Sequence, residues 1–185
     1  MSHTVEPVSL VAAGVVTPFG ADLDAFWSGL ITGSDGISMI ERFPVDDLRV
    51  GRGGEIKKLR ALPAARRVGC RASQLLLAAA EDLLARSPIS AEPARVAVVL
   101  GTALGGVGEL ERAMAPGGRA RHAAGALYDS PAHALAHRLD ARGPVLTVGA
   151  ACAAGATALG TAPISCAPTS STSSSPAAMT RSAGS

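Results

Sequence analysis

Short apolar runs alternate along the chain with longer segments in which apolar residues recur every three or four positions. The runs at 8–14, 95–100 and 145–148 have the length of strands, and runs without polar alternation are typical of strands buried on both faces. Helical periodicity follows at 22–31, 64–85, 107–114, 130–139 and 153–162, with Asp22 as the expected first N-cap. Glycine-containing residues 38–64 predict loops with short elements. This alternation predicts an α/β domain whose sheet is mostly buried beneath helices.

The last part of the chain, residues 163–185, is rich in Ser, Thr, Pro and Ala and has no periodicity. This composition predicts a disordered tail. Back-translated with GC-rich codons and shifted by one base, residues 163–178 can instead encode a helix end followed by an apolar strand. We therefore expect a frameshift near Ala162 and a compensating shift before Met179, in which case Cys166 has no role. Each large apolar side chain lost from the core costs about 1.5–3 kcal/mol, so the chain as written is expected to be unstable or aggregation-prone.

Composition and charge disfavour several classes of partner. The chain carries 17 basic and 15 acidic residues, a net charge of +2, and it has no long basic run, so no nucleic-acid partner is expected. The longest apolar runs are far shorter than the roughly 20 residues that span a bilayer, and the N-terminus lacks the pattern of a signal peptide. A local basic patch, Lys57, Lys58 and Arg60 with Arg66 and Arg67, favours a solvated face, and docking of an acidic carrier protein stays open as the alternative.

The cysteines and histidines predict neither a metal site nor a disulfide framework. Three cysteines without a CxxC spacing favour a reducing cytoplasm. His133 and His137 lie four residues apart on a predicted helix, a spacing that can bind metal, but no third ligand motif accompanies them. His3 and His122 are expected on the surface. No cofactor and no metal are expected.

Cys152 stands where a predicted buried strand changes into a helix of Ala and Gly. A thiol at a helix N-terminus feels the positive end of the dipole and unpaired backbone N–H groups, and both favour the thiolate. Gly149 and Gly155 allow a sharp turn and the close approach of a substrate carbonyl, and the Cys152 N–H can stabilise an oxyanion. From these residues alone two interpretations stay open, a nucleophile or a small buried cysteine. Cys70 is expected to be structural.

The segment Val145–Ala156 resembles the active-site signature of the β-ketoacyl synthases of the thiolase superfamily, in which a strand ending in Thr-Val leads to Ala-Cys-Ala-(Ser/Ala)-Gly. Other segments are similar to the family in order and spacing. They are Gly14–Gly20, Phe26–Trp27 with Gly33–Ile37, Gly101–Gly106 with Leu110–Glu111, and Ser130–Pro131 with Gly143–Pro144. The resemblance covers residues 8–162, with departures at Gly149-Ala150 and at Gly69-Cys70.

The resemblance implies that residues 1–162 are the N-terminal half of a thiolase-like fold, a mixed sheet covered by helices and incomplete on its own. It also implies a decarboxylative Claisen condensation in fatty-acid or polyketide synthesis. Cys152 would accept an acyl group from an acyl carrier protein, and a malonyl group on the carrier would lose CO2 and attack the acyl-enzyme.

The resemblance also implies catalytic groups that the family takes from its second half. Two histidines and a second oxyanion N–H come from that half, so the fragment itself is expected to be inactive. A homodimer or a heterodimer with another ketosynthase subunit is expected, with residues 144–149 near the two-fold axis. Two alternatives stay open: an acyltransferase of the superfamily that does not decarboxylate malonyl units, and a non-catalytic partner subunit.

Overall fold

A two-stranded parallel sheet forms the central layer of the molecule. The computed structural model describes residues 8–57, 59 and 70–166. The sheet consists of β3 (Val98–Gly101) and β4 (Val145–Val148), with Val98 paired to Val145 and Gly101 paired to Val148. Because both strands point the same way, their carboxyl ends meet at one edge, and the turn after β4 begins there.

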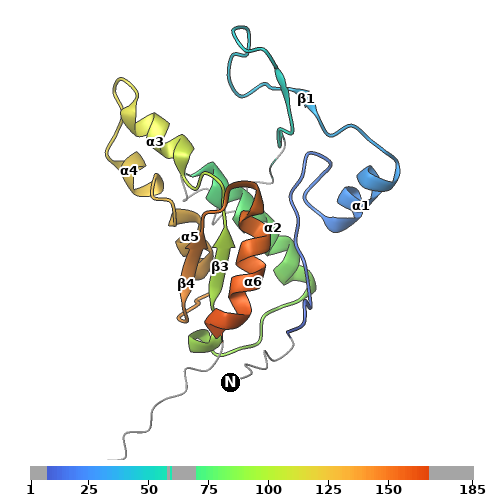
Figure 1. Ribbon diagram of the computed structural model, residues 1–185, viewed down its shortest axis with the longest axis vertical. Coiled ribbons are helices and arrows are strands. Elements are labelled where there is room, and N and C mark those ends of the chain that lie inside the picture. Colours follow the sequence, from blue (N-terminus) through green and yellow to red (C-terminus); the bar gives the residue numbers. More distant parts are fainter. Residues whose placement is uncertain (1–7, 58, 60–69, 167–185) are drawn as a thin grey trace, which may run out of the picture.

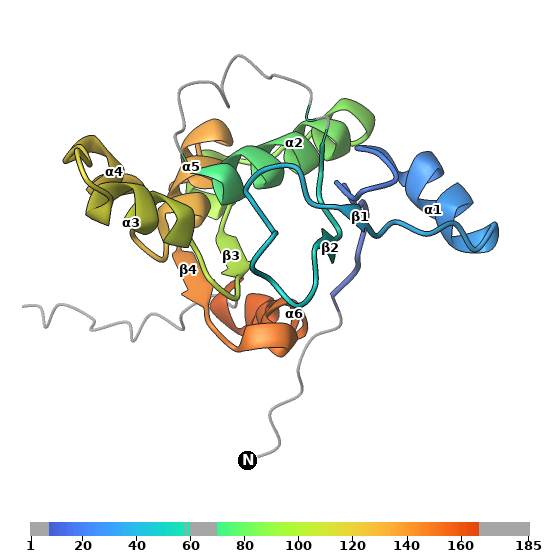
Figure 2. The ribbon, with the colours of Figure 1, turned by 90° about the horizontal axis from the view of Figure 1, so that it is seen from above.

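Helices cover both faces of this sheet. α6 (Ala154–Cys166) lies on one face, and α5 (Ser130–Arg138) lies on the other with α2 (Arg71–Arg86) packed against it (Figure 1, Figure 2). The predicted α/β layering is therefore observed in the described residues. Within them, no helix is long and apolar enough to cross a membrane.

The core lies between β3 and α5 and is built from small side chains. Val98, Ala132 and Ala136 are buried there, and alanines allow the helix to approach the sheet closely. Partly buried apolar side chains surround this cluster: Leu100, Leu135, Leu139, Ala141 and Val145. On the outer side, Arg138 of α5 donates to both carboxylate oxygens of Glu81 on α2, and this contact raises the pKa of Arg138 above its ordinary value. Contacts between small apolar side chains thus hold α5 to β3, and the ion pair between Arg138 and Glu81 joins α5 to α2.

The connection between β3 and β4 contains α5 and, before it, two shorter helices. α3 (Val107–Met114) packs against α4 (Arg121–Gly125), and a parallel connection needs a crossover of this kind. Glu109 is only 2% exposed, and its carboxylate contacts the Arg112 guanidinium and lies 2.6 Å from Nδ1 of His122. The expectation that His122 is a surface residue is therefore wrong: the ring is partly buried because it joins α4 to a carboxylate that has no access to water.

The first part of the chain forms a smaller module. Asp22 caps α1 (Leu23–Ile31) by accepting from the Ala25 N–H at 2.7 Å, as the sequence predicts. β1 (Ser38–Met39) pairs antiparallel with β2 (Arg52–Gly53), the short elements expected within 38–64. The backbone N–H of Ile37 and the Arg52 guanidinium both donate to Asp35 and lower the pKa of its carboxyl group.

Residues 8–14 are not the buried strand that their apolar character predicts. They form no strand, and Leu10 and Val11 are 84% and 85% exposed. This segment instead runs beside α2: Arg86 donates to the Ala13 carbonyl at 2.7 Å, and a Cβ on Gly14 would lie 2.1 Å from the Ala79 carbonyl oxygen. A strand needs a neighbouring edge for its backbone groups, and within the described residues only β3 and β4 pair in the central sheet.

Three element boundaries also differ from the predictions. β3 begins at Val98 rather than residue 95, because Pro93–Arg95 form a 3-10 turn. α2 begins at Arg71 with Cys70 as its N-cap, and the rest of the expected start, residues 64–69, lies outside the described residues. α6 continues to Cys166 through Pro163, past the expected end at Ala162. The remainder of the predicted tail, residues 167–185, also lies outside the described part.

Gly101→Ala is expected to destabilise the chain, because the new Cβ would lie 2.2 Å from the Ala154 carbonyl oxygen and 2.7 Å from the Gly155 nitrogen. Both atoms are backbone, so α6 must move away from β3, at a cost of about 1–3 kcal/mol. The matched control is Gly160→Ala in the interior of α6, where nothing lies within 4 Å and a gain of up to about 1 kcal/mol is expected. Pulse proteolysis in urea at low protein concentration measures both, and equal effects would contradict the close contact.

Glu109→Gln is expected to cost about 1–3 kcal/mol, because a neutral amide at this buried position no longer offsets the charge of Arg112. Glu111→Gln on the exposed side of the same helix is the control and should change stability by less than about 0.5 kcal/mol. The same proteolysis assay compares them, and an indifferent Glu109→Gln would show that the buried carboxylate does not hold α3 to α4.

Candidate active site

The turn between β4 and α6 carries Cys152. β4 ends at Val148, Gly149 and Ala150 follow, and Ala151–Ala153 form a 3-10 turn that leads directly into α6. The Ala153 N–H donates to the Ala150 carbonyl at 2.9 Å and closes this turn. Because β4 and α6 run in opposite senses on either side of it, the turn is the point where the chain reverses beside the sheet.

Ala151, the residue before the cysteine, has a φ of +45°. This left-handed conformation is unfavourable for a residue with a Cβ, and such strain concentrates where the surrounding structure over-determines a functional turn. A strained strand-to-helix turn that carries an exposed side chain is also the arrangement that presents a nucleophile in the hydrolase elbow. The sequence pattern predicts that the glycines Gly149 and Gly155 make the sharp turn possible. In the structure, the left-handed conformation is instead at Ala151.

The thiol of Cys152 is exposed, so the interpretation of this residue as a buried core cysteine does not fit the geometry. α6 begins two residues later at Ala154, and the first N–H groups of a helix have no partner within the helix. Ala154 and Ala158 are the buried residues on the sheet-facing side of α6. Cys152 therefore lies at the N-terminal end of α6, open to solvent.

Tyr128 supports the turn from the β3 side. Its hydroxyl donates to the Thr102 carbonyl at 2.6 Å, just after the end of β3. A Cβ on Gly149 would lie 2.7 Å from that hydroxyl oxygen, so a side chain at position 149 would have to displace the Tyr128 ring. Beside Gly155, by contrast, nothing lies within 4 Å of the Cβ position, so the first turn of α6 is open at this residue.

The other residues of interest lie away from this turn. Cys70 is 3% exposed and precedes α2, which agrees with a structural role. His133 lies 3.3 Å from the Asp129 carboxylate on α5, and His137 belongs to the last turn of the same helix. Among the described residues, no three side chains of the metal-binding types gather into one group.

Some of the residues that the sequence brings to notice lie outside the described part. They are His3, Lys58, Arg60, Arg66 and Arg67, and the side chain of Cys166 is also not described. Of the basic patch, Lys57 is described, and it pairs with Glu41.

Comparisons with known proteins agree with the motifs. The family described as "Beta-ketoacyl synthase, N-terminal domain" matches residues 5–165. The 3-oxoacyl-[acyl-carrier-protein] synthase 2 of Synechocystis sp. is 40% identical over 50 residues, which are 27% of this chain and 12% of that protein. The solved structure of the ishigamide ketosynthase/chain length factor superposes with a TM-score of 0.67 at 20% identity, over 83% of this chain and 47% of its own. This chain thus spans about half the length of that structural neighbour, and their likeness shows a shared fold.

Cys152 is expected to be alkylated by iodoacetamide at least about tenfold faster than Cys70, because the first thiol is exposed and the second is buried. Peptide mapping by mass spectrometry after a short exposure separates the two sites and also resolves Cys166. Mapping in urea serves as the control, since unfolding should bring the two rates together. Equal rates under native conditions would contradict the exposed position of Cys152.

Proposed function

The chain belongs to the β-ketoacyl synthase family as its N-terminal part, and we propose that Cys152 is the nucleophile of a decarboxylating condensation. The observation that carries this proposal is the position of Cys152: an exposed thiol at the start of α6, directly after the strained residue Ala151. The fold and the family match support the same reaction type, in which carbon chains grow on thioesters.

Acyl transfer is the first half-reaction. The Cys152 thiolate attacks the carbonyl of an acyl thioester on a carrier protein, the C–S bond to the carrier breaks, and the carrier thiol leaves with a proton. The backbone N–H of Cys152 donates to the oxygen that becomes negative in the tetrahedral intermediate. The open space beside Gly155 gives this carbonyl room to approach.

Condensation is the second half-reaction. A malonyl thioester loses CO2, and its enolate carbon attacks the acyl-cysteine carbonyl. The bond between this carbonyl and the Cys152 sulfur breaks, which returns the thiolate and releases a 3-oxoacyl thioester. The reaction as proposed needs no metal and no organic cofactor. The histidines that the family resemblance assigns to decarboxylation are expected beyond this sequence, so this chain alone is proposed to be inactive in condensation.

The partners follow from the same proposal. An acyl carrier protein brings both thioesters, and a second ketosynthase subunit, identical or related, packs beside residues 144–149. Within the described residues, β4 pairs with β3 along one edge and with no strand along the other, and Leu146 on this strand is 38% exposed. An unpaired edge with an exposed leucine supports an interface at this place. Cysteine usage supports a cytoplasmic location.

The acylation step is directly testable with this chain. Incubation with an acyl-loaded carrier protein should add the mass of one acyl group to the chain and to the control Cys70→Ala, but not to Cys152→Ala. Intact-mass and peptide mass spectrometry read the result. An acyl group on Cys70 or Cys166, or one that persists in Cys152→Ala, would remove Cys152 as the nucleophile.

Two further measurements separate the alternatives. Supplying malonyl-carrier protein to the protein translated from the complete gene should release CO2 and 3-oxoacyl product, and acylation without CO2 release would favour a non-decarboxylating acyltransferase. No acylation in either protein would favour a non-catalytic partner subunit. The DNA sequence after codon 162 tests the frameshift, because a continuous frame that encodes the Ser-rich tail would contradict it.

A further inference from the structure

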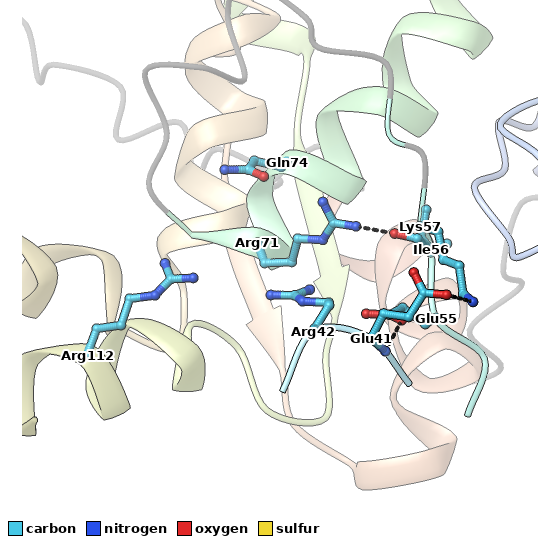
Figure 3. A pocket seen from close by; sticks show the side chains of 8 residues that line it. All are labelled: Glu41, Arg42, Glu55, Ile56, Lys57, Arg71, Gln74 and Arg112. Atoms are coloured by element: carbon cyan, nitrogen blue, oxygen red, sulfur yellow. Dashed lines mark hydrogen bonds and ion pairs between the residues drawn. The ribbon is translucent and has the colours of Figure 1, made fainter. Parts of the chain in front are cut away.

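A cleft lined by arginines lies between the β1–β2 region, the start of α2 and α3. It consists of two adjoining cavities of about 360 and 540 Å³. Both are lined by Arg42, Arg71 and Arg112 together with Glu55 and Ile56. We call this hollow the arginine cleft. Figure 3 shows Arg71 on α2, Arg112 on α3 and Arg42 on the loop between β1 and β2.

Arg42 and Arg71 line the arginine cleft without an ion pair among the described residues. Arg42 makes no hydrogen bond or ion pair within the part of the chain that the structure describes. The pKa of Arg71 is lowered first by its burial and second by the nearby positive charge of Arg42. Arg71 donates to the Ile56 carbonyl at 2.6 Å, while its Nε is buried without a partner among the described residues. Two like charges in one cavity repel each other unless an anion lies between them.

The carboxylates of the cleft do not supply that anion in full. Glu41 pairs with Lys57, and one oxygen of Glu55 accepts the Glu41 N–H at 2.8 Å. Glu55 is the carboxylate that offsets the charge of Arg71. Arg112 is already neutralised by Glu109. Glu111 also lines the larger cavity, but neither Glu55 nor Glu111 makes an ion pair with Arg42 or Arg71 among the described residues.

An apolar wall continues from the charged side. The larger cavity is also lined by Ile40, Phe43 and Leu75, and Phe43 is about half-exposed. Guanidinium groups bind phosphate through two parallel N–H···O bonds, and an organic group attached to the phosphate would rest on this wall. A ligand with both features fits the cleft better than a bare ion.

We propose that the arginine cleft binds a phosphate ester, with the phosphate on Arg42 and Arg71 and its apolar organic group against Ile40, Phe43 and Leu75. The proposal goes beyond the condensation chemistry and does not involve Cys152. A phosphate group placed between the two guanidinium groups replaces their repulsion with attraction to both.

Protection from phenylglyoxal, which modifies arginine guanidinium groups, tests the proposal on the full chain. Phenyl phosphate should slow the modification of Arg42 by about tenfold at saturation, and inorganic phosphate should do so only at higher concentration. Arg95, exposed and outside the cleft, is the internal control and should be unaffected. Peptide mass spectrometry follows each site separately, so the result is independent of whether Cys152 is acylated.

Two variants sharpen the test. Arg42→Gln, a change at an exposed position, should abolish the protection of Arg71. Phe43→Ser should keep protection by inorganic phosphate and lose the advantage of phenyl phosphate. Benzoate that protects Arg42 as well as phenyl phosphate does would overturn the assignment to phosphate. Equal protection of Arg95, or none at Arg42, would overturn the site.

Discussion

The contact between the end of β3 and the first turn of α6 is the constraint on which the candidate active site depends. Gly101 closes β3 so tightly against Ala154 that any side chain would overlap the α6 backbone. This contact leaves α6 little freedom in where it can begin, and Cys152 lies two residues before that start. Since the central sheet has only two described strands, the position of α6 depends on its packing against β3 and β4.

A second set of contacts acts on the same turn from the opposite side. Tyr128, held by its hydroxyl to the Thr102 carbonyl, occupies the space that a side chain at position 149 would need. The backbone after β4 therefore passes close to the Tyr128 ring at Gly149. The chain then changes direction at Ala151, which has a left-handed conformation. Strain at that residue persists because β4 and α6 are each held elsewhere. The thiol next to it is exposed as a consequence of this path and not of a flexible loop.

How much the sequence could predict depended on whether a feature was local. β4, α3 and α1 with its Asp22 cap were predicted closely, because periodicity and capping are properties of neighbouring residues. Residues 8–14 were predicted wrongly, since apolar character does not say whether a strand edge is available to pair with. The burial of His122 against Glu109 and the arginine cleft were missed for a related reason: their residues come from separate elements, and no spacing within the sequence brings them together. The place of Cys152 between a strand and a helix start was predicted because the strand, the turn and the helix are contiguous in the sequence.

The position of Cys152 also separates the two halves of the proposed reaction. Acyl transfer needs an exposed thiol, a nearby backbone N–H and room for one carbonyl, and residues 149–155 contain all three. In the proposed condensation, decarboxylation would generate a carbanion, and polar groups beside the acyl-cysteine would have to stabilise it. A thiol held on one turn, as proposed for Cys152, suits a reaction in two half-steps, because the acyl group would have to stay in one place while one carrier protein leaves and the next arrives.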